Sequence, residues 1–171
     1  GVGDGTTQQG EFLEAIAEAV REELPVLFVI QDNQWAISTP TVGRTFFSLP
    51  NGPGETFYGL PIHHVDGRDV ETAFHAFSAI VTQVRETRGP AVVIFRVERL
   101  ASHTNADDQT IYRTAEDLAR AEQESDPIRI AEAKLLKSGM TQADLKVIQS
   151  QVKDQIAAAE AEAMVGETPL P

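Results

Sequence analysis

In residues 10–30 the spacing of apolar residues changes at Pro25, from a helix-like repeat to a continuous run. This change constrains the fold more strongly than any other feature of the sequence. From Gly10 to Glu23 apolar residues recur every three or four positions, which predicts an amphipathic helix with one buried face that continues to Leu24. Pro25 ends that pattern, and residues 26–30 form a short continuous apolar run. Such a run is typical of a strand covered on both faces in a parallel sheet. A second apolar run at 91–97 repeats the signal, so we expect an α/β fold.

Short polar motifs stand at both ends of this helix and strand. Gly3-Asp4-Gly5 precedes the predicted helix, and Asp32-Asn33 follows the predicted strand. Open parallel sheets bind ligands at the carboxyl ends of their strands, so the two motifs can meet at one site. Mg²⁺ prefers carboxylate and other oxygen ligands, and a helix start with free amides attracts phosphate. Each motif alone is typical of a turn, but together they predict a diphosphate and metal site.

The three segments 3–12, 24–26 and 33–39 resemble the thiamine diphosphate motif of one family. That family is the alpha subunits of thiamine diphosphate-dependent 2-oxo acid dehydrogenase decarboxylating components. The resemblance extends from Gly3 to about Gly139, and residues 36–41 lean toward the branched-chain members. It implies a parallel-sheet thiamine diphosphate-binding domain.

The resemblance also implies roles for individual residues. It assigns Mg²⁺ to the side chains of Asp4 and Asn33 and to the backbone carbonyl of Trp35. It assigns the diphosphate of thiamine diphosphate to Gly5 and Thr6, and the hydroxyls of Thr6 and Thr7 can add hydrogen bonds. Two positions depart from the family pattern, because Asp32 replaces the first Asn of the usual pair and Trp35 replaces a Tyr.

Residues 98–113 are polar, lack any hydrophobic period, and are predicted to form a long loop after the second strand. They resemble a family loop that orders over bound cofactor and carries a histidine into the active site. His103 is the matching residue, and its imidazole can donate a proton or bind the diphosphate. We expect Asp107, Tyr112 and Arg113 to order the loop. Thr104 stands where some members carry a phosphorylated Ser.

The other histidines have weaker claims on function. His63 and His64 lie in a predicted strand, where neighbouring side chains point to opposite faces and cannot easily share a metal. His75 lies off the apolar stripe of a predicted helix and is expected to be exposed. That stripe is a larger set: Val70, Ala73, Phe74, Phe77, Ile80, Val81 and Val84. Residues 43–58 match the family less well, and we expect a mobile loop there.

The C-terminal third is predicted to be helical. Thr114 and Asp126-Pro127 resemble helix starts, and Ser138-Gly139 resembles a helix stop. Residues 141–165 predict a helix with apolar residues on one face, at Leu145, Ile148, Val152 and Ile156, which suits either packing on the core or an interface. We therefore expect an α/β domain at 1–113, its helical extension at 114–165 and a linker or tail at 166–171.

Composition narrows the class of partner. Among 171 residues there is no Cys, so disulfides and thiolate sites are absent. The net charge of −12 argues against nucleic acid and anionic membranes, which are met by clustered Lys and Arg. No apolar run reaches membrane-spanning length. We expect a cytoplasmic enzyme, with a mitochondrial source left open because only Gly1-Val2 precede the motif and the domain is expected to be N-terminally incomplete.

The expected function is decarboxylation of a 2-oxo acid, branched-chain by preference, with acyl transfer to a lipoyl-bearing acyltransferase. The family takes the Glu that activates the cofactor from a beta subunit, so we expect a homo- or hetero-oligomer, such as a heterotetramer, and no turnover by this chain alone. The chain is expected to be a fragment, a split subunit or part of a fused protein. The alternatives are an acetoin-cleaving or transketolase-like thiamine diphosphate enzyme, and a non-catalytic interaction fragment.

Overall fold

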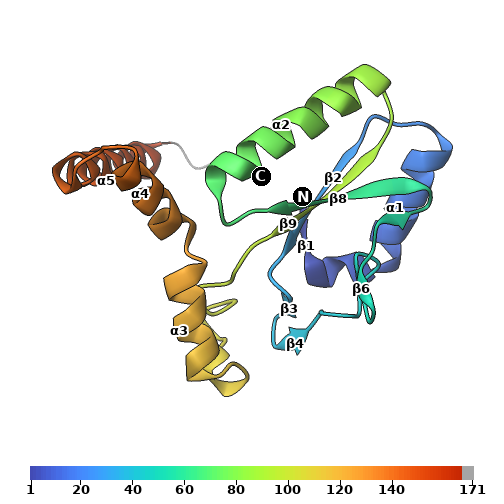
Figure 1. The fold of residues 1–171 in the computed structure, drawn as a ribbon, viewed down its shortest axis with the longest axis horizontal. Coiled ribbons are helices and arrows are strands. Elements are labelled where there is room, and N and C mark those ends of the chain that lie inside the picture. Colours follow the sequence, from blue (N-terminus) through green and yellow to red (C-terminus); the bar gives the residue numbers. More distant parts are fainter. Residues whose placement is uncertain (167–171) are drawn as a thin grey trace. The chain divides into compact units, whose positions relative to one another are not determined.

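The computed structural model describes residues 1–166 and contains a compact unit from Gly1 to Ile130 and a second unit that begins at Ala131 (Figure 1). The first unit holds the sheet and every predicted site residue. The division expected at residue 113 stays a prediction, since compactness alone does not define a domain.

The sheet of the first unit has five strands in the order β1-β2-β9-β8-β7. Four of them are parallel, whereas β7 pairs antiparallel with β8. Their bounds are β1 (Val2–Gly3), β2 (Leu27–Asp32), β9 (Ala91–Arg96), β8 (Leu60–Asp66) and β7 (Thr56–Phe57). The predicted α/β class with a mostly parallel sheet is therefore confirmed.

Strand β2 differs from its prediction at both ends. It begins one residue later than expected and continues to Asp32, because its pairing with β9 extends to the Asp32↔Arg96 pair. Asp32 is thus the last residue of the strand, and Asn33 is the first residue after it. The parallel pairing of β1 with β2 matches Gly3 with Gln31, so Asp4 and Asp32 leave the sheet at the same edge.

Helices α1 (Gly10–Arg21) and α2 (Val70–Thr87) lie on opposite faces of the sheet (Figure 1). The two faces carry separate apolar clusters because side chains alternate along each strand. The cluster on the α1 face contains Ile16, Ile30, Phe47, Ile62, Val92 and Ile94. The cluster on the α2 face contains Val65, Ile80, Val84, Ala91 and Val93.

The helix predicted at 10–24 ends early, and the prediction for Leu24 was wrong. After Arg21 the chain turns through Glu23, whose φ is 51°, and the amide of Leu24 donates to the carbonyl of Ala19. This is a left-handed helix end, which carries Leu24 off the helix face. Its side chain is 41% exposed.

Helix α2 begins at the Asp69 cap, whose side chain accepts hydrogen bonds from the amides of Glu71 and Thr72. The predicted stripe is only partly buried, because Phe74 is 67% exposed and Val70 is exposed as well. The apolar cluster under α2 is formed around Phe77, Ile80 and Val84. The N-terminal part of α2 therefore lies at the margin of the contact between the helix and the sheet.

The histidine predictions fit the structure. His63 and His64 are neighbours on β8, opposite Val93 and Ile94, so they face different sides of the sheet. His75 is exposed on α2.

Residues 43–58 form short hairpin strands, and an aromatic cluster anchors them. The strands here and just before are β3 (Trp35–Ala36), β4 (Thr39–Pro40), β5 (Ser48–Leu49) and β6 (Gly52–Pro53). Phe47 is 2% exposed and belongs to the cluster on the α1 face, and Phe46 stacks on Phe57 with ring centroids 4.3 Å apart. The loop expected here is therefore attached to the core.

The helices expected after residue 113 are present. They are α3 (Ala115–Glu124), α4 (Pro127–Lys137) and α5 (Gln142–Val165), and short 3-10 helices η1 (Asp4–Gln8) and η2 (Gln109–Ile111) complete the list. Thr114 caps α3, and Gly139 follows α4 with a φ of 103°. On α5 only Leu145 is buried, and the rest of the predicted stripe is exposed. Gly166 follows α5, and the predicted tail beyond it lies outside the described residues.

In the part of the chain that the structure describes, no helix combines the length and apolar character that crossing a bilayer requires.

Candidate functional site

Two successive side chains reverse the chain at the end of β2. The Asp32 Oδ1 atom accepts a hydrogen bond of 3.0 Å from the Gln34 amide, and the Asn33 Oδ1 atom accepts one of 3.0 Å from the Trp35 amide. These are Asx turns, in which a short polar side chain stabilises the backbone two residues ahead. They hold Gln34 at a φ of 67° and direct the chain into the β3–β4 hairpin.

Asp4 lies in the interior at the start of η1. The residue is 2% exposed, and its Oδ2 atom accepts a hydrogen bond of 2.5 Å from the Thr41 hydroxyl. The Thr41 amide donates to the Gln34 carbonyl over 3.0 Å, so Thr41 ties Asp4 to the turn that contains Asn33. No local pattern in the sequence indicates this role of Thr41, because its partner Asp4 is 37 positions away.

Thr7 does not serve as expected. Its side chain is fully buried and its hydroxyl donates to the Asp4 carbonyl over 2.6 Å, so the predicted contribution of this hydroxyl to ligand binding was wrong. The hydroxyl instead closes the first turn of η1. Thr6 is exposed on the same 3-10 helix.

Gly5 brings η1 against the hairpin. A Cβ atom at this position would lie 2.7 Å from the Cβ of Ala36, closer than two carbon atoms can approach. Any larger residue would push the Asp4 segment away from β3. The structure thus gives Gly5 a packing role beside the predicted approach to phosphate.

The carbonyl of Trp35 is left out of the hairpin ladder. The Thr41 amide donates to the Gln34 carbonyl at a hydrogen-bonding position of the hairpin, while the Gln34 amide donates to Asp32, and hydrogen-bonding positions alternate with non-bonded ones in antiparallel strands. The next pair, Trp35↔Pro40, is therefore non-bonded, and Pro40 has no amide hydrogen in any case. The N–H and C=O of one strand residue point to the same side, so the Trp35 carbonyl lies on the side where its amide meets Asn33.

The charges at this edge favour a cation. Burial raises the pKa of Asp32, the hydrogen bond from Gln34 opposes the rise, and the negative charge of Asp4 adds to it. Asp4 and Asp32 are therefore close enough to repel. No cluster of three His, Cys or acidic side chains in residues 1–166 suits a metal, so a metal here would need amide and carbonyl oxygens as well.

The loop that carries His103 docks on the β3–β4 hairpin. Arg99 donates from Nη1 to the Ile37 carbonyl and from Nη2 to the Tyr112 hydroxyl, each over 2.7 Å. The Tyr112 ring also contacts the Trp35 ring, with centroids 5.4 Å apart. The indole that replaces the family's Tyr thus attaches the two predicted site segments to each other.

A carboxylate within the same loop joins two of its segments by hydrogen bonds. Asp107 Oδ2 accepts hydrogen bonds from the Tyr112 hydroxyl over 2.6 Å and from the His103 amide over 2.8 Å. His103 itself is exposed, and no hydrogen bond in the described structure joins its imidazole to Asp4, Asn33 or Trp35. The structure therefore positions the backbone of His103 but leaves its side chain outside the cluster of predicted metal ligands.

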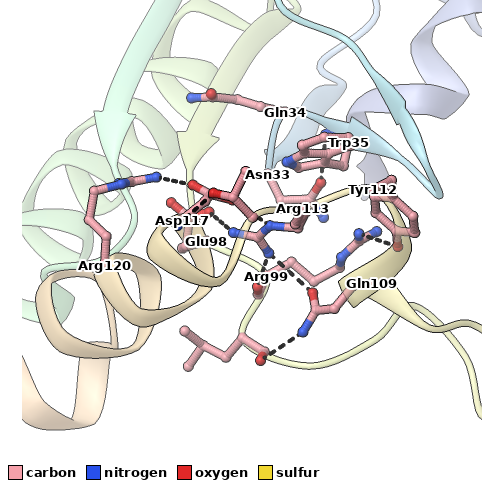
Figure 2. Close-up of polar contacts among 12 residues, drawn as sticks. Asn33, Gln34, Trp35, Glu98, Arg99, Gln109, Tyr112, Arg113, Asp117 and Arg120 are labelled. Atoms are coloured by element: carbon pink, nitrogen blue, oxygen red, sulfur yellow. Dashed lines mark hydrogen bonds and ion pairs between the residues drawn. The ribbon is translucent and has the colours of Figure 1, made fainter.

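Arg113 is the buried centre of the loop's base (Figure 2). Its side chain is fully buried and donates to Glu98 over 3.1 Å and to Asp117 over 2.6 Å. It also donates to the Arg99 carbonyl and to the Gln109 side chain. These contacts agree with the expectation that Arg113, Tyr112 and Asp107 order the loop, whereas the sequence offered no signal for Arg99 and Gln109.

A pocket of about 810 Å³ opens beside this turn. Asp32 and Gln34 line it, but Asp4, Asn33 and Trp35 do not. It lies at the carboxyl ends of β2, β9 and β8, next to the predicted metal ligands and separate from them.

Residues 1–170 match the protein family described as Dehydrogenase E1 component. The 3-methyl-2-oxobutanoate dehydrogenase subunit alpha of Mycobacterium tuberculosis (strain CDC 1551 / Oshkosh) is 36% identical over 120 residues, which are 70% of this chain and 32% of the relative. The pyruvate dehydrogenase E1 component subunit alpha of Acholeplasma laidlawii is 38% identical over 117 residues, 68% of this chain and 34% of the relative. That of Mycoplasma genitalium (strain ATCC 33530 / DSM 19775 / NCTC 10195 / G37) is 33% identical over 170 residues, 99% of this chain and 47% of the relative. The chain spans less than half the length of these curated relatives.

Proposed function

The chain belongs to the dehydrogenase E1 component family, and from this membership we propose that it forms the diphosphate- and metal-binding part of a 2-oxo acid dehydrogenase alpha subunit. The observation that carries the proposal is the edge of the sheet where Asp4 and Asn33 leave neighbouring strands. There a buried carboxylate, an amide oxygen and a carbonyl outside its ladder belong to connected segments.

The residues present fit a magnesium ion. Asp4 brings a full negative charge in a buried position, and one of its oxygens is fixed by Thr41, which leaves the other for a ligand. Asn33 and the Trp35 carbonyl add neutral oxygens, and Mg²⁺ usually completes its shell with water and phosphate. Asp4, Asn33 and Trp35 would hold the ion, and Gly5 and Thr6 would bind the diphosphate.

Thiamine diphosphate, when bound, supplies the carbanion chemistry that decarboxylates a 2-oxo acid. The chain's own residues bind and orient. Asp4 and Asn33 would hold the metal ion that binds the diphosphate, and His103 is the residue proposed to donate a proton or a hydrogen bond in the reaction pocket. The exposure of its imidazole suits a side chain that meets a surface supplied from outside this unit.

The partners belong to the proposal. The residues of this chain provide no match for the Glu that activates the cofactor, so a beta subunit or beta-like region would supply it within a heterotetramer. A lipoyl-bearing acyltransferase would accept the acyl group. The branched-chain preference rests on residues 36–41, and the ratio of decarboxylation rates with 3-methyl-2-oxobutanoate and pyruvate tests it on the full-length enzyme.

Replacing Asp4 with Asn tests the metal assignment. The variant keeps the shape of the side chain and loses its charge, so Mg²⁺-dependent thiamine diphosphate binding by the full-length assembled enzyme should weaken by at least tenfold, measured by calorimetry. Unfolding of the cofactor-free protein should not become easier, because no Lys or Arg of the described residues pairs with this buried carboxylate.

Asp154→Asn is the matched control, because it removes the same charge from the exposed face of α5 and should leave cofactor binding unchanged. Unaltered binding by the Asp4 variant would refute the metal assignment. Absence of Mg²⁺-dependent binding in the unmodified enzyme would favour the non-catalytic interaction fragment, and activity with acetoin or sugar phosphates would favour the other thiamine diphosphate enzymes.

A further inference from the structure

The pocket beside the strand-end turn has one polar wall and one apolar wall. The polar wall comes from the ends of the parallel strands, with Asp32 from β2, Arg96 from β9, and His64 and Asp66 from β8. Its volume of about 810 Å³ lies within the range of small-molecule sites, which are roughly 300–1,000 Å³.

The apolar wall is built by the segment between β4 and β6. Val42, Leu49 and Pro50 line the pocket, and the first two are exposed to solvent. His64 fixes this wall, since its Nε2–H donates to the Gly54 carbonyl over 2.8 Å. A side chain at Gly54 would overlap the Phe46 carbonyl, so the backbone path of the wall is set by packing.

In the polar wall Arg68 and Asp66 form an ion pair, whereas Arg96 and Asp32 are register partners that attract each other through space without a hydrogen bond or ion pair between them. Arg68 binds Asp66 with two hydrogen bonds, Nε to Oδ1 over 2.8 Å and Nη2 to Oδ2 over 2.7 Å, which neutralises both. No hydrogen bond or ion pair of the described residues uses the Arg96 guanidinium or the Asp32 Oδ2 atom. Arg96 and Asp32 therefore offer one donor group and one acceptor group to the same cavity.

We propose that this pocket binds a small α-amino acid with an aliphatic side chain. The ligand's carboxylate would meet Arg96, its ammonium group would meet Asp32, and its side chain would lie against Val42 and Leu49. A ligand with only a negative charge would be repelled by Asp32, and one with only a positive charge by Arg96. A zwitterion alone complements both, and an arginine–carboxylate contact is among the stronger charged hydrogen bonds. This proposal is independent of the proposed function.

A series of three ligands tests the charge argument on the unmodified full-length protein. L-leucine, 4-methylpentanoate and 3-methylbutylamine share an aliphatic body and differ in their charged groups. Calorimetry should show leucine binding, with the other two at least about tenfold weaker, because each lacks one charged contact. If leucine does not bind at millimolar concentrations, or if either single-charge ligand binds as tightly, the proposal is wrong.

The variant Arg96→Gln tests whether leucine binds in this pocket. It should raise the dissociation constant of leucine by roughly tenfold or more. Arg85→Gln is the matched control, since it removes an exposed arginine from α2, outside the pocket, and should leave leucine binding unchanged. An Arg96 variant that is folded by circular dichroism and binds leucine with unaltered affinity would place any leucine site elsewhere. If that variant fails to fold, the ligand series still decides.

Discussion

Single residues link the two predicted site segments. Tyr112 contributes its hydroxyl to the chain from Arg99 to Asp107, and its ring meets Trp35. Burial raises the pKa of Tyr112, and its hydrogen bond to Asp107 adds to the rise, so the phenol stays protonated and can donate at neutral pH. Tyr112 thereby connects the β3–β4 hairpin to the backbone of His103.

Tyr112→Phe should loosen the His103 loop. The variant keeps the aromatic contact with Trp35 but removes the donor to Asp107, and the His103 amide shares that carboxylate. Hydrogen exchange in residues 98–113 of the full-length protein should become several-fold faster. Tyr58→Phe, at an exposed ring outside this loop, serves as control and should not alter exchange there. Equal exchange in both variants would contradict the role of Tyr112.

The order of the loop should depend on pH through the ionisation of Asp107. The hydrogen bond from Tyr112, followed by that from the His103 amide, lowers the pKa of Asp107. A depressed pKa stabilises the folded state fully above the ordinary value of about 3.9 and ceases to do so as the pH falls through the depressed value. The His103 amide resonance should therefore titrate below the ordinary Asp range, and at higher pH in the Tyr112→Phe variant. Titration at or above the ordinary value in the unmodified protein would exclude this contact.

At the scale of elements, aromatic packing decides which segments are attached to the hydrophobic core. Residues 43–58 carry no helix or strand period, yet Phe47 inserts into the cluster under α1 and Phe46 stacks on Phe57. By contrast, α2 has a regular stripe, and one of its phenylalanines, Phe74, is mostly exposed. In both segments a phenylalanine is buried only where its side chain reaches the sheet, whatever the period of the sequence around it.

A pair of phenylalanine substitutions separates these cases. Phe47→Ala should lower the free energy of unfolding by about 3–5 kcal/mol, because it opens a cavity in the core. Phe74→Ala should change it by less than about 1 kcal/mol, since most of that ring is already in water. Urea denaturation of the full-length protein measures both. Equal losses would show that residues 43–58 are less firmly packed than the structure has them.

At the scale of the whole molecule, the chain holds one side of a proposed active site. Its −12 net charge does not oppose diphosphate binding, which local amides and a metal decide. The edge with Asp4, Asn33 and the Trp35 carbonyl holds the proposed metal ligands, while the proposed activating Glu has no counterpart here. The proposed chemistry therefore needs a second chain or region.

Reconstitution tests this requirement. The full-length alpha subunit alone should show no decarboxylation of 3-methyl-2-oxobutanoate or pyruvate with an artificial electron acceptor. Adding the beta partner should produce turnover, and omitting Mg²⁺ should abolish it. Turnover by the alpha subunit alone would show that the activating acid is already present in it.

The sequence by itself determined the parts that depend on local chemistry. The proline at residue 25 and the change of period predict α1 and β2, and the caps at Thr114 and Asp126 predict α3 and α4. The Asp-Asn pair predicts a turn, because its side chains reach amides only two residues ahead. The proposed metal ligands Asp4, Asn33 and Trp35 lie in such short motifs.

The tertiary structure alone decided what joins segments far apart in the chain. The bond from Thr41 to Asp4, the contact of Gly5 with Ala36 and the docking of Arg99 on Ile37 leave no period or motif in the sequence. The same holds for the pocket with Arg96 and Asp32, which exists because β2 and β9 end side by side. A local sequence pattern indicates only the interactions of a residue with its near neighbours in the chain. These long-range contacts depend instead on how the strands are paired in the sheet.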